Sequence, residues 1–375
     1  MKVLITGANG FLGRNLQLHL HERQDVEVAL FTREHRPDQL RDLLEDVDFV
    51  FHLAGVNRPQ DPSEFAVGNG DLTRTLCCAV ADAARAGDRK IPIVYTSSTQ
   101  AAFDNPYGRS KRQAEDALRH TGLDPLTPVH VFRLPNVFGK WSLPNYNSVV
   151  ATFCHNIARG LPIQINDSQA AVTLVYVDDV MERFIQVMDG ADPALDTDGF
   201  ETVTTQYTLT VGELARQLEC FRDSRATLMT GRVGSGLVRA LYSTYVSYLP
   251  VETFAYEVPQ HTDPRGVFVE MLKTPDNGQF SYFTAHPGVT RGGHYHHSKT
   301  EKFLVIQGEA MFRFRHMVTN ERVELRTSGA RPKVVDTIPG WSHDITNVGD
   351  DEMVVMLWAN ENFDRQKPDT VASKV

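Results

Sequence analysis

The chain of 375 residues lacks any apolar run long enough to cross a lipid bilayer, and it lacks an excess of positive charge. Its net charge is −9 and its Lys and Arg residues are scattered, which argues against a protein that binds nucleic-acid phosphates. Cysteine is scarce, and no two cysteines have the C-x-x-C spacing. The four are Cys77, Cys78, Cys154 and Cys220. Adjacent cysteines cannot easily bridge each other, so we expect buried free thiols in a reducing compartment.

The first six residues run directly into a glycine-rich turn, which leaves no room for a signal peptide. With the free thiols, this predicts a cytoplasmic protein without membrane insertion. A chain of 375 residues is also too long for one ordinary hydrophobic core, so two domains are expected.

Residues 1–190 alternate short apolar segments with helical ones. The expected strands are 1–6, 26–32, 47–53, 91–97 and 129–134, and the expected helices are 11–23, 39–44, 71–86 and 110–120. This alternation is typical of a Rossmann-type, doubly wound parallel sheet with crossover helices. The polar stretch 189–199 ends the pattern, and helices are expected at 211–222 and 239–249.

From about residue 250, short apolar strands are separated by Gly, Pro, Asn and Asp, which predicts an all-β sandwich or barrel. The expected strands are 268–272, 279–284, 302–306, 310–316, 323–327 and 353–358. We therefore divide the chain into domains 1–248 and 249–375. The polar tail 364–375 is expected to be loosely held.

A glycine-rich turn follows the first predicted strand and opens the first predicted helix. Its residues are Gly7, Ala8, Asn9, Gly10, Phe11, Leu12 and Gly13. Glycines at this position let a dinucleotide's pyrophosphate approach the backbone N–H groups of a helix N-terminus. The second predicted strand ends near Arg33 with no acidic residue for a ribose hydroxyl. Arg33 could bind the 2′-phosphate of NADP(H), which favours NADP(H) over NAD. The alternative is that Arg33 is a solvated surface arginine without a role in binding.

Tyr107 and Lys111 are four residues apart, so on a helix they share one face. A neighbouring ammonium can lower the pKa of a phenol, which would make Tyr107 a proton donor to a carbonyl that accepts hydride. Ser98 ends an earlier predicted strand and could hold that carbonyl. A lone Y-x-x-x-K pattern is common by chance, but the glycine turn and the order of these residues favour a catalytic role.

Roughly residues 1–245 resemble the extended short-chain dehydrogenases/reductases that act on sugar nucleotides. The matching segments are T-G-A-N-G-F-L-G (6–13), H-L-A-G (52–55), Y-G-R-S-K (107–111), R-L-P-N-V-F-G (133–139) and L-V-Y-V-D-D-V (174–180). The resemblance implies that Ser98, Tyr107 and Lys111 are the catalytic trio. It also implies that Leu53, Ala54 and Gly55 line the cofactor, with Pro135 near the nicotinamide and Asn136 near the substrate. The segment between Ser98 and Tyr107, with Phe103, is unusually short for the family.

The segment 288–308 carries a second pattern, in which His294 and His296 alternate along one predicted strand and Glu301 begins the next. With His343 further on, three imidazoles and a carboxylate form a donor set that suits Zn²⁺ or another divalent first-row ion. The spacing of Gly288, His294, His296, Glu301 and Gly308 resembles the first cupin motif, which implies a jelly-roll domain. Pro339, directly before Gly340, departs from the second motif at the turn.

Residues 261–270 resemble the D-x-R-G-x-F-x-E segment of deoxysugar-nucleotide epimerases, which implies that Arg265 holds a nucleotide diphosphate. In those metal-free enzymes the histidine of R-G-x-H, here His294, is the proton-abstracting base. A lysine there stabilises the enolate, near the position that Glu301 holds here. We therefore hypothesise that a metal bound through Glu301 replaces the lysine. His294 cannot serve as ligand and base together; we assign it as a ligand, so the base is unassigned.

With its two regions in this order, the chain resembles the bifunctional enzymes that make capsular-polysaccharide precursors. This resemblance covers nearly the whole chain. The resemblance implies C3 epimerisation of a UDP-2-acetamido-2,6-dideoxy-4-keto-hexose, then NADPH-dependent reduction at C4 to UDP-2-acetamido-2,6-dideoxy-L-talose. It also implies a homodimer. Two alternatives stay open. One is a reductase whose metal-bound cupin serves only for dimerisation, and the other is a non-catalytic NADPH sensor.

Overall fold

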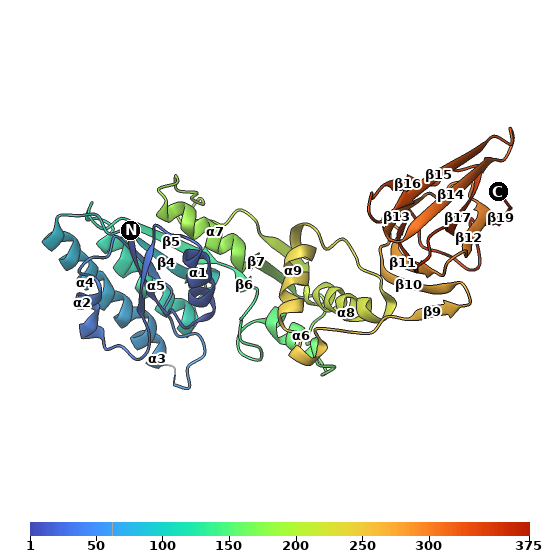
Figure 1. The fold of residues 1–375 in the computed structure, drawn as a ribbon. Helices are drawn as coiled ribbons and strands as arrows, with labels where there is room; N and C mark the ends of the chain where they lie inside the picture. The colour runs from blue at the N-terminus through green and yellow to red at the C-terminus, as the bar shows by residue number, and fades with distance from the viewer. Residues whose placement is uncertain (62) are drawn as a thin grey trace. The chain divides into compact units, whose positions relative to one another are not determined.

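The computed structural model describes residues 1–61 and 63–375, and they form two compact units (Figure 1). The first unit comprises Met1–Leu218 and Gly236–Pro250, and the second comprises Glu219–Ser235 and Val251–Val375. The segment Glu219–Ser235 thus belongs to the second unit, although the sequence pattern had placed it before the predicted boundary at 248/249. Within the described ranges, no helix is long and apolar enough to cross a membrane.

The main sheet of the first unit is parallel throughout, in the order β2-β1-β3-β4-β5. Its strands are β1 (Lys2–Thr6), β2 (Glu27–Phe31), β3 (Phe49–His52), β4 (Ile93–Ser98) and β5 (Val129–Leu134). The connecting helices are α1 (Phe11–His21), α2 (Leu40–Leu43), α4 (Leu72–Gly87) and α5 (Pro106–Thr121). The predicted parallel α/β arrangement is confirmed. Helix α5 begins at Pro106, four residues before the predicted start, because Asn105 caps it by accepting a hydrogen bond from the Gly108 N–H at 2.8 Å.

Several elements of the first unit were not predicted. They are η1 (Pro37–Gln39), α3 (Ser63–Phe65), the π-helical η2 (Ala66–Asp71), η3 (Thr99–Ala102), β6 (Asn136–Phe138), α6 (Val149–Ala158), β7 (Ala171–Tyr176), α7 (Val177–Met188) and β8 (Tyr207–Thr210). Strands β6, β7 and β8 form a separate small sheet. The predicted helices at 211–222 and 239–249 correspond to α8 (Val211–Thr227) and α9 (Gly236–Ser247).

The second unit contains two antiparallel sheets, in the orders β16-β13-β18-β11-β10-β9 and β15-β14-β17-β12-β19. A short η4 (Val251–Thr253) precedes β9 (Gln260–Asp263), β10 (Gly266–Lys273), β11 (Gln279–Ala285), β12 (Thr290–Tyr295), β13 (Glu301–Gln307), β14 (Glu309–His316), β15 (Arg322–Ser328), β16 (Val334–Asp336), β17 (Trp341–Asn347), β18 (Met353–Ala359) and β19 (Val371–Ala372). Phe303 and Val355 of one sheet and Phe312 and Ile345 of the other belong to one buried cluster. The all-β prediction is therefore confirmed, while the jelly-roll assignment stays a prediction.

The prediction of a loosely held tail is wrong for residues 369–374. Strand β19 pairs with β12, where Ala372 lies opposite His294. The Arg315 guanidinium donates to the Lys374 carbonyl at 2.7 Å and to the Ser373 hydroxyl at 2.9 Å. Polar composition misled the prediction because backbone hydrogen bonds, which any residue type can make, fix this segment.

A buried ion pair fastens helix α5 to the main sheet. Glu115 on α5 is 2% exposed, and it accepts hydrogen bonds from Arg133 of β5 at 2.7 and 2.9 Å and from Ser97 of β4. The Arg133 guanidinium lies 3.8 Å from the centre of the Phe200 ring. This pair fixes the position of the helix that carries Tyr107 and Lys111.

We expect Glu115→Ala to lower the free energy of unfolding by about 3 kcal/mol, because it leaves the Arg133 guanidinium partly buried without its carboxylate. Asp116→Asn changes the exposed neighbour on the same helix and should cost less than about 0.5 kcal/mol. Urea unfolding followed by circular dichroism measures both. Equal stability losses in the two variants would contradict the role given to this ion pair.

Candidate functional site

The glycine turn after β1 is so close to neighbouring backbone that it excludes side chains. Gly7 has φ +69°, and a Cβ there would lie 2.6 Å from the Ala54 backbone nitrogen. A Cβ on Gly13 would lie 2.4 Å from the Gly7 carbonyl oxygen. Both positions therefore require glycine, and the turn packs directly against the segment that follows β3.

Helix α1 begins at this turn with free N–H groups. Its N-cap is Gly10, which offers no side-chain cap, and its first turn contains no acidic residue. Asn9 is exposed, and Phe11 and Leu12 are half-buried in the first helical turn. An uncapped helix N-terminus without carboxylates favours an anion, so these residues fit the pyrophosphate of a dinucleotide.

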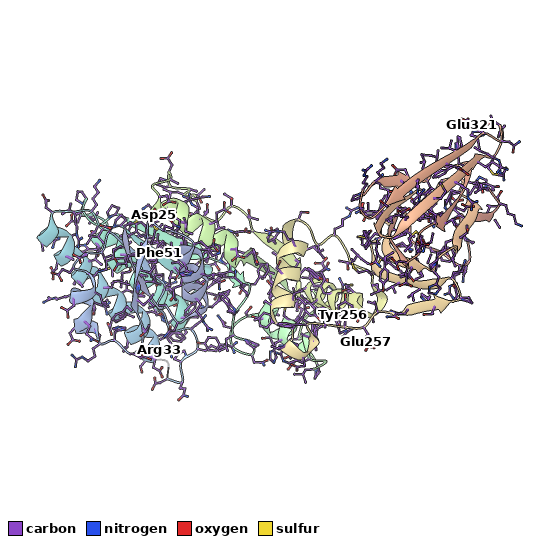
Figure 2. The ribbon with its side chains drawn as sticks, viewed as in Figure 1. Asp25, Arg33, Phe51, Tyr256, Glu257 and Glu321 are labelled. Carbon is purple, nitrogen blue, oxygen red and sulfur yellow. The ribbon has the colours of Figure 1, made fainter. Side chains whose placement is uncertain are left out.

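Two further segments with predicted cofactor residues lie at the same edge of the sheet. Ala54 donates its N–H to the Thr6 hydroxyl at 3.2 Å, which holds Leu53–Gly55 beside the end of β1. Arg33 is exposed in the loop after β2 (Figure 2), and Phe31 at the end of β2 is paired with Thr6. Parallel strands place their carboxyl ends together, so the structure brings these segments to one edge.

The predicted catalytic trio is also brought together at this edge. Ser98 ends β4, and Tyr107 lies in the first turn of α5. Burial raises the pKa of the Tyr107 phenol, while a hydrogen bond with Ser98 opposes that rise. The expected net lowering of this pKa by Lys111 is therefore not found, and Tyr107 stays protonated at neutral pH, as a proton donor requires.

Lys111 is buried at 5% exposure, and its ammonium donates to the Thr96 carbonyl oxygen at 2.9 Å. The nitrogen lies 5.9 Å from the centre of the Tyr107 ring, and burial lowers the pKa of Lys111 to about 8. A Cβ on Gly55 would lie 3.3 Å from this nitrogen. Lys111 therefore sits between the proposed proton donor and the cofactor-lining segment.

The short connection between Ser98 and Tyr107 packs tightly against Gly108 in the first turn of α5. A Cβ there would lie 2.3 Å from the Gln100 carbonyl oxygen and 2.4 Å from that of Phe103. The helix start therefore packs against the connection, and Phe103 itself points outward at 58% exposure.

Sequence reasoning missed two buried polar residues that hold this edge. Asn69 accepts a hydrogen bond from the Val56 N–H at 2.8 Å and donates to the Ser110 hydroxyl at 2.9 Å. His52, whose burial lowers its pKa to about 3, bridges the hydroxyls of Thr6 and Thr73 at 2.7 and 2.8 Å. Asn69 belongs to no motif with fixed spacing. His52 opens the H-L-A-G segment, for which the resemblance implied roles only for Leu53, Ala54 and Gly55.

Pro135 and Asn136 follow β5 directly, so they lie beyond the carboxyl end of the strand next to β4. Asn136 is exposed, and its side-chain amide donates to the Thr173 carbonyl at 3.2 Å. Their predicted contacts with nicotinamide and substrate stay predictions.

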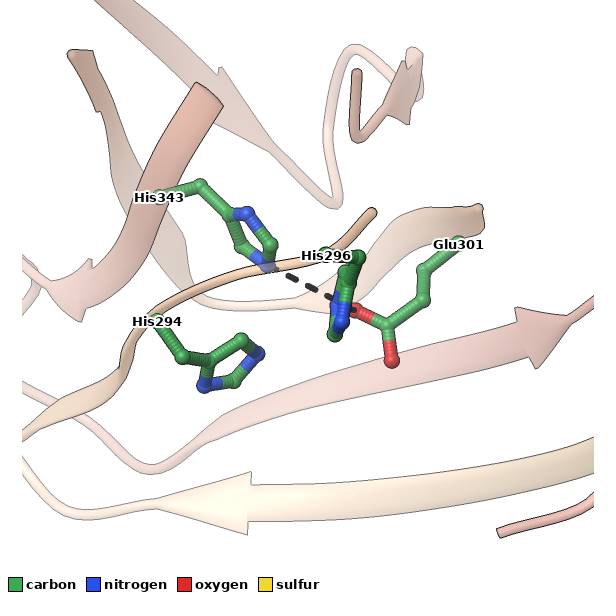
Figure 3. Close-up of side chains that lie close together, drawn as sticks. All are labelled: His294, His296, Glu301 and His343. Carbon is green, nitrogen blue, oxygen red and sulfur yellow. Dashed lines mark hydrogen bonds and ion pairs between the residues drawn. The ribbon is translucent and has the colours of Figure 1, made fainter. Parts of the chain in front are cut away.

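In the second unit, His294, His296, Glu301 and His343 converge on one point (Figure 3). One potential ligand atom from each lies within 4.8 Å of the others. The Glu301 carboxylate lies 3.3 Å from His296 Nε2 and 3.5 Å from His343 Nε2. The ring centres of His294 and His343 are 4.7 Å apart.

Local backbone irregularity aims His294 into this cluster. The pairing of β12 with β17 shifts between Gly292 and His294, which places His294 opposite His343. Gly292 has φ +95°, and a Cβ there would lie 2.9 Å from the His343 carbonyl oxygen. A bulge with two positive-φ glycines, Gly292 and Gly293, therefore turns the histidine toward its neighbours.

The donor set fits a divalent first-row metal ion. His343 Nε2 is buried without a hydrogen-bond partner, and Nδ1 of the same ring donates to the Trp341 carbonyl at 3.3 Å. Burial lowers the pKa of His294 to about 4, so its imidazole is neutral and able to coordinate at neutral pH. The pKa of Glu301 lies far below its usual range, because its contacts with His296 and His343 and the charge of Lys299 outweigh burial. Three imidazoles and a carboxylate are typical zinc ligands.

Of the basic residues near the cluster, one contacts Glu301 and the others are exposed to solvent. The Lys299 ammonium is buried and lies 3.0 Å from Glu301 Oε1, a contact that the sequence did not predict. Lys302 is exposed and pairs with the exposed Asp336. His297 is exposed.

Two arginines lie close together elsewhere in the second unit. Arg265, in the turn between β9 and β10, pairs with Asp263. Arg291 on β12 donates from Nε to the Thr284 carbonyl at 2.9 Å, while its Nη2 is buried without a partner. Burial and the positive charge of Arg265 both lower the pKa of Arg291. Arg291 is the arginine of the R-G-x-H match, but that resemblance implied a role only for the histidine.

Two family models match this chain. Residues 3–197 match the NAD dependent epimerase/dehydratase family, and residues 261–371 match the polysaccharide biosynthesis C-terminal domain. The first match contains the glycine turn and the catalytic trio, and the second contains the histidine cluster.

Relatives match the chain over its full length. A UDP-2-acetamido-2,6-beta-L-arabino-hexul-4-ose reductase of Pseudomonas aeruginosa (strain PA103) is 62% identical over all of this chain and 99% of its own. The crystal structure of the capsular polysaccharide assembling protein CapF from Staphylococcus aureus superposes with a TM-score of 0.92, at 41% identity and full coverage of both chains. A UDP-glucose 4-epimerase of Thermotoga maritima, 18% identical, shares the fold over 66% of this chain and 98% of its own with a TM-score of 0.54. The chain therefore belongs to the family of CapF-type enzymes over its whole length, and through residues 3–197 to the NAD dependent epimerase/dehydratase family.

Proposed function

We propose that this protein converts a UDP-2-acetamido-2,6-dideoxy-4-keto-hexose in two steps, one in each unit. The second unit epimerises C3, and the first unit then reduces the C4 ketone to give UDP-2-acetamido-2,6-dideoxy-L-talose. The observation that carries the reductase step is the convergence of the glycine turn, Ser98, Tyr107 and Lys111 at one edge of the parallel sheet. The P. aeruginosa relative, named as a reductase of a UDP-linked hexulose, supports the substrate class.

In the reductase step, the residues of the first unit bind the ketone and supply a proton. A bound nicotinamide cofactor would provide the hydride for C4. Tyr107 then donates its proton to the C4 oxygen, so that hydride and proton together convert the ketone to an alcohol. Ser98 holds that oxygen, and Lys111 carries the positive charge that stabilises the phenolate left on Tyr107.

In the epimerase step, the C4 ketone acidifies the neighbouring C3 proton, so that a base, to which no residue is assigned, can take it up and a proton can return to the opposite face of C3. A divalent ion held by His294, His296, Glu301 and His343 would supply positive charge for the enolate oxygen. The unpartnered Nη2 of Arg291, next to Arg265, offers a guanidinium for the diphosphate of the substrate. The two steps fit one substrate, because the ketone that activates C3 is consumed only by the reduction.

The decisive test uses Tyr107→Phe with the 4-keto UDP-sugar and NADPH. Loss of the donated proton should lower kcat for NADPH oxidation by about 10²–10⁴-fold. Deuterium uptake at C3 in D₂O should continue at the wild-type rate, because the exchange takes place in the other unit. Tyr256→Phe, which removes the hydroxyl of an exposed tyrosine outside the trio, serves as the matched control (Figure 2).

Two results would speak against the proposal. If the wild-type protein oxidises no NADPH with this substrate, the reductase assignment fails. If it oxidises NADPH without any exchange at C3, the second unit has a structural role instead of a catalytic one.

Arg33 is proposed to select NADPH over NADH through the 2′-phosphate. Arg33→Ala should raise the Kd of NADPH about tenfold, the loss of roughly one charge-assisted hydrogen bond, while the Kd of NADH stays unchanged. Arg36→Ala removes a nearby exposed arginine that pairs with Asp38, and it should alter neither value. Fluorescence titration measures both constants, and an equal change for the two cofactors would refute selection by Arg33.

The histidine cluster is proposed to hold a catalytic divalent ion. Removal of the metal with a chelator should abolish C3 exchange, and added Zn²⁺ should restore it. His343→Ala should bind Zn²⁺ at least about tenfold more weakly, whereas His297→Ala, an exposed histidine outside the cluster, should bind normally. Metal content by mass spectrometry and exchange by NMR test this. Full exchange in the metal-free protein would rule out the catalytic ion.

A further inference from the structure

The segment 369–374 contacts strands that carry the histidines of the cluster. Strand β19 pairs with β12, where Ala372 lies opposite His294 and Val371 lies opposite Tyr295. The Ser373 N–H donates to the Gly293 carbonyl at 2.9 Å, at the bulge that aims His294. The Ser342 hydroxyl, directly before His343, donates to the Ser373 carbonyl at 2.6 Å. The segment therefore holds both β12 and β17 beside their histidines.

The carboxylate of Asp369 caps three consecutive backbone N–H groups in the loop between His296 and Glu301. It accepts hydrogen bonds from the N–H groups of His297, Ser298 and Lys299 at 2.9, 2.7 and 2.8 Å. The Ser298 hydroxyl adds a fourth bond at 3.0 Å. Successive N–H groups that point at one anion form a backbone nest, and these bonds hold the pKa of Asp369 well below its usual range.

The backbone of Asp369 acts on a proposed metal ligand directly, because its carbonyl oxygen is hydrogen-bonded to His296 Nδ1. A carbonyl can only accept, so Nδ1 carries the ring proton when the imidazole is neutral, the form that binds a metal. His296 Nε2 is then left as the lone-pair nitrogen, and it is the atom that faces Glu301 at 3.3 Å. A hydrogen bond of this kind fixes the tautomer and the orientation of a metal-binding imidazole.

We infer that Asp369 is a positioning residue of the metal centre and that the segment 369–374 belongs to this centre. The inference rests on the proposed metal centre and goes beyond its four ligands. His343 receives the equivalent support from Trp341, two residues away, whereas His296 depends on a partner 73 residues further along the chain. Metal affinity should therefore depend on how firmly this segment is held.

The test compares Asp369→Asn and Asp369→Ala with the full-length wild-type protein, and Asp364→Asn is the matched control. Asp364 is an exposed carboxylate of the same tail that accepts a hydrogen bond from the Gln366 N–H. The Zn²⁺ affinity of each protein is measured by competition with a chromogenic chelator. Hydrogen exchange of residues 293–299 is measured in the metal-free proteins, and circular dichroism checks the β-sheet content.

We expect Asp369→Asn to weaken Zn²⁺ binding about tenfold and Asp369→Ala by up to about 100-fold, with faster exchange at residues 297–299. Asp364→Asn should match the wild type in both readouts. Unchanged Zn²⁺ affinity in both Asp369 variants would overturn the inference while leaving the metal centre intact. If the wild-type protein binds no Zn²⁺, the metal centre and the inference fail together. Should Asp369→Ala not fold, the milder Asp369→Asn decides.

Discussion

The parallel register of β1, β3 and β4 is the constraint on which the first unit depends. Parallel strands end at one edge, and here those ends carry Gly7, Leu53 and Ser98. Helix α5 must then pack close enough to bring Tyr107 and Lys111 to the same edge. The hydrogen bond from Lys111 to the Thr96 carbonyl and the ion pair of Glu115 with Arg133 both hold it there.

Much of this arrangement could be predicted because it is encoded locally. Glycine positions, the Tyr107–Lys111 spacing and the H-x-H pattern each depend on residues a few positions apart. Contacts between distant residues have no such pattern. Asn69 reaches Ser110 across 41 residues, and nothing in the sequence around either residue indicates that they meet.

The tyrosine pKa shows a second limit of sequence reasoning. The spacing predicted that Lys111 would lower the pKa of Tyr107, but it carried no information about burial. In the structure, burial raises that pKa, and Lys111 directs its proton to a backbone carbonyl instead. The sign of an electrostatic effect thus depended on solvent exposure, which composition and spacing do not give.

The second unit uses a different principle, in which antiparallel pairing places distant strands side by side. His294 and His343 are opposite each other because β12 pairs with β17, and β13 supplies Glu301 from the other sheet. The four side chains therefore join the two sheets at one point. The buried cluster between the two sheets packs against these side chains. The ring centres of Phe303 and Phe314 lie 6.5 and 6.2 Å from the ring centre of His343.

The hydrogen bond from His296 to Asp369 has a consequence for biosynthesis. Translation runs from the N-terminus to the C-terminus, so all four histidine and glutamate side chains are made before Asp369. A nascent chain that has just passed His343 contains all four side chains of the cluster but lacks the carbonyl that is hydrogen-bonded to His296. The order of synthesis therefore delays the completed cluster of His294, His296, Glu301 and His343 until residues 371 and 372 have paired with β12.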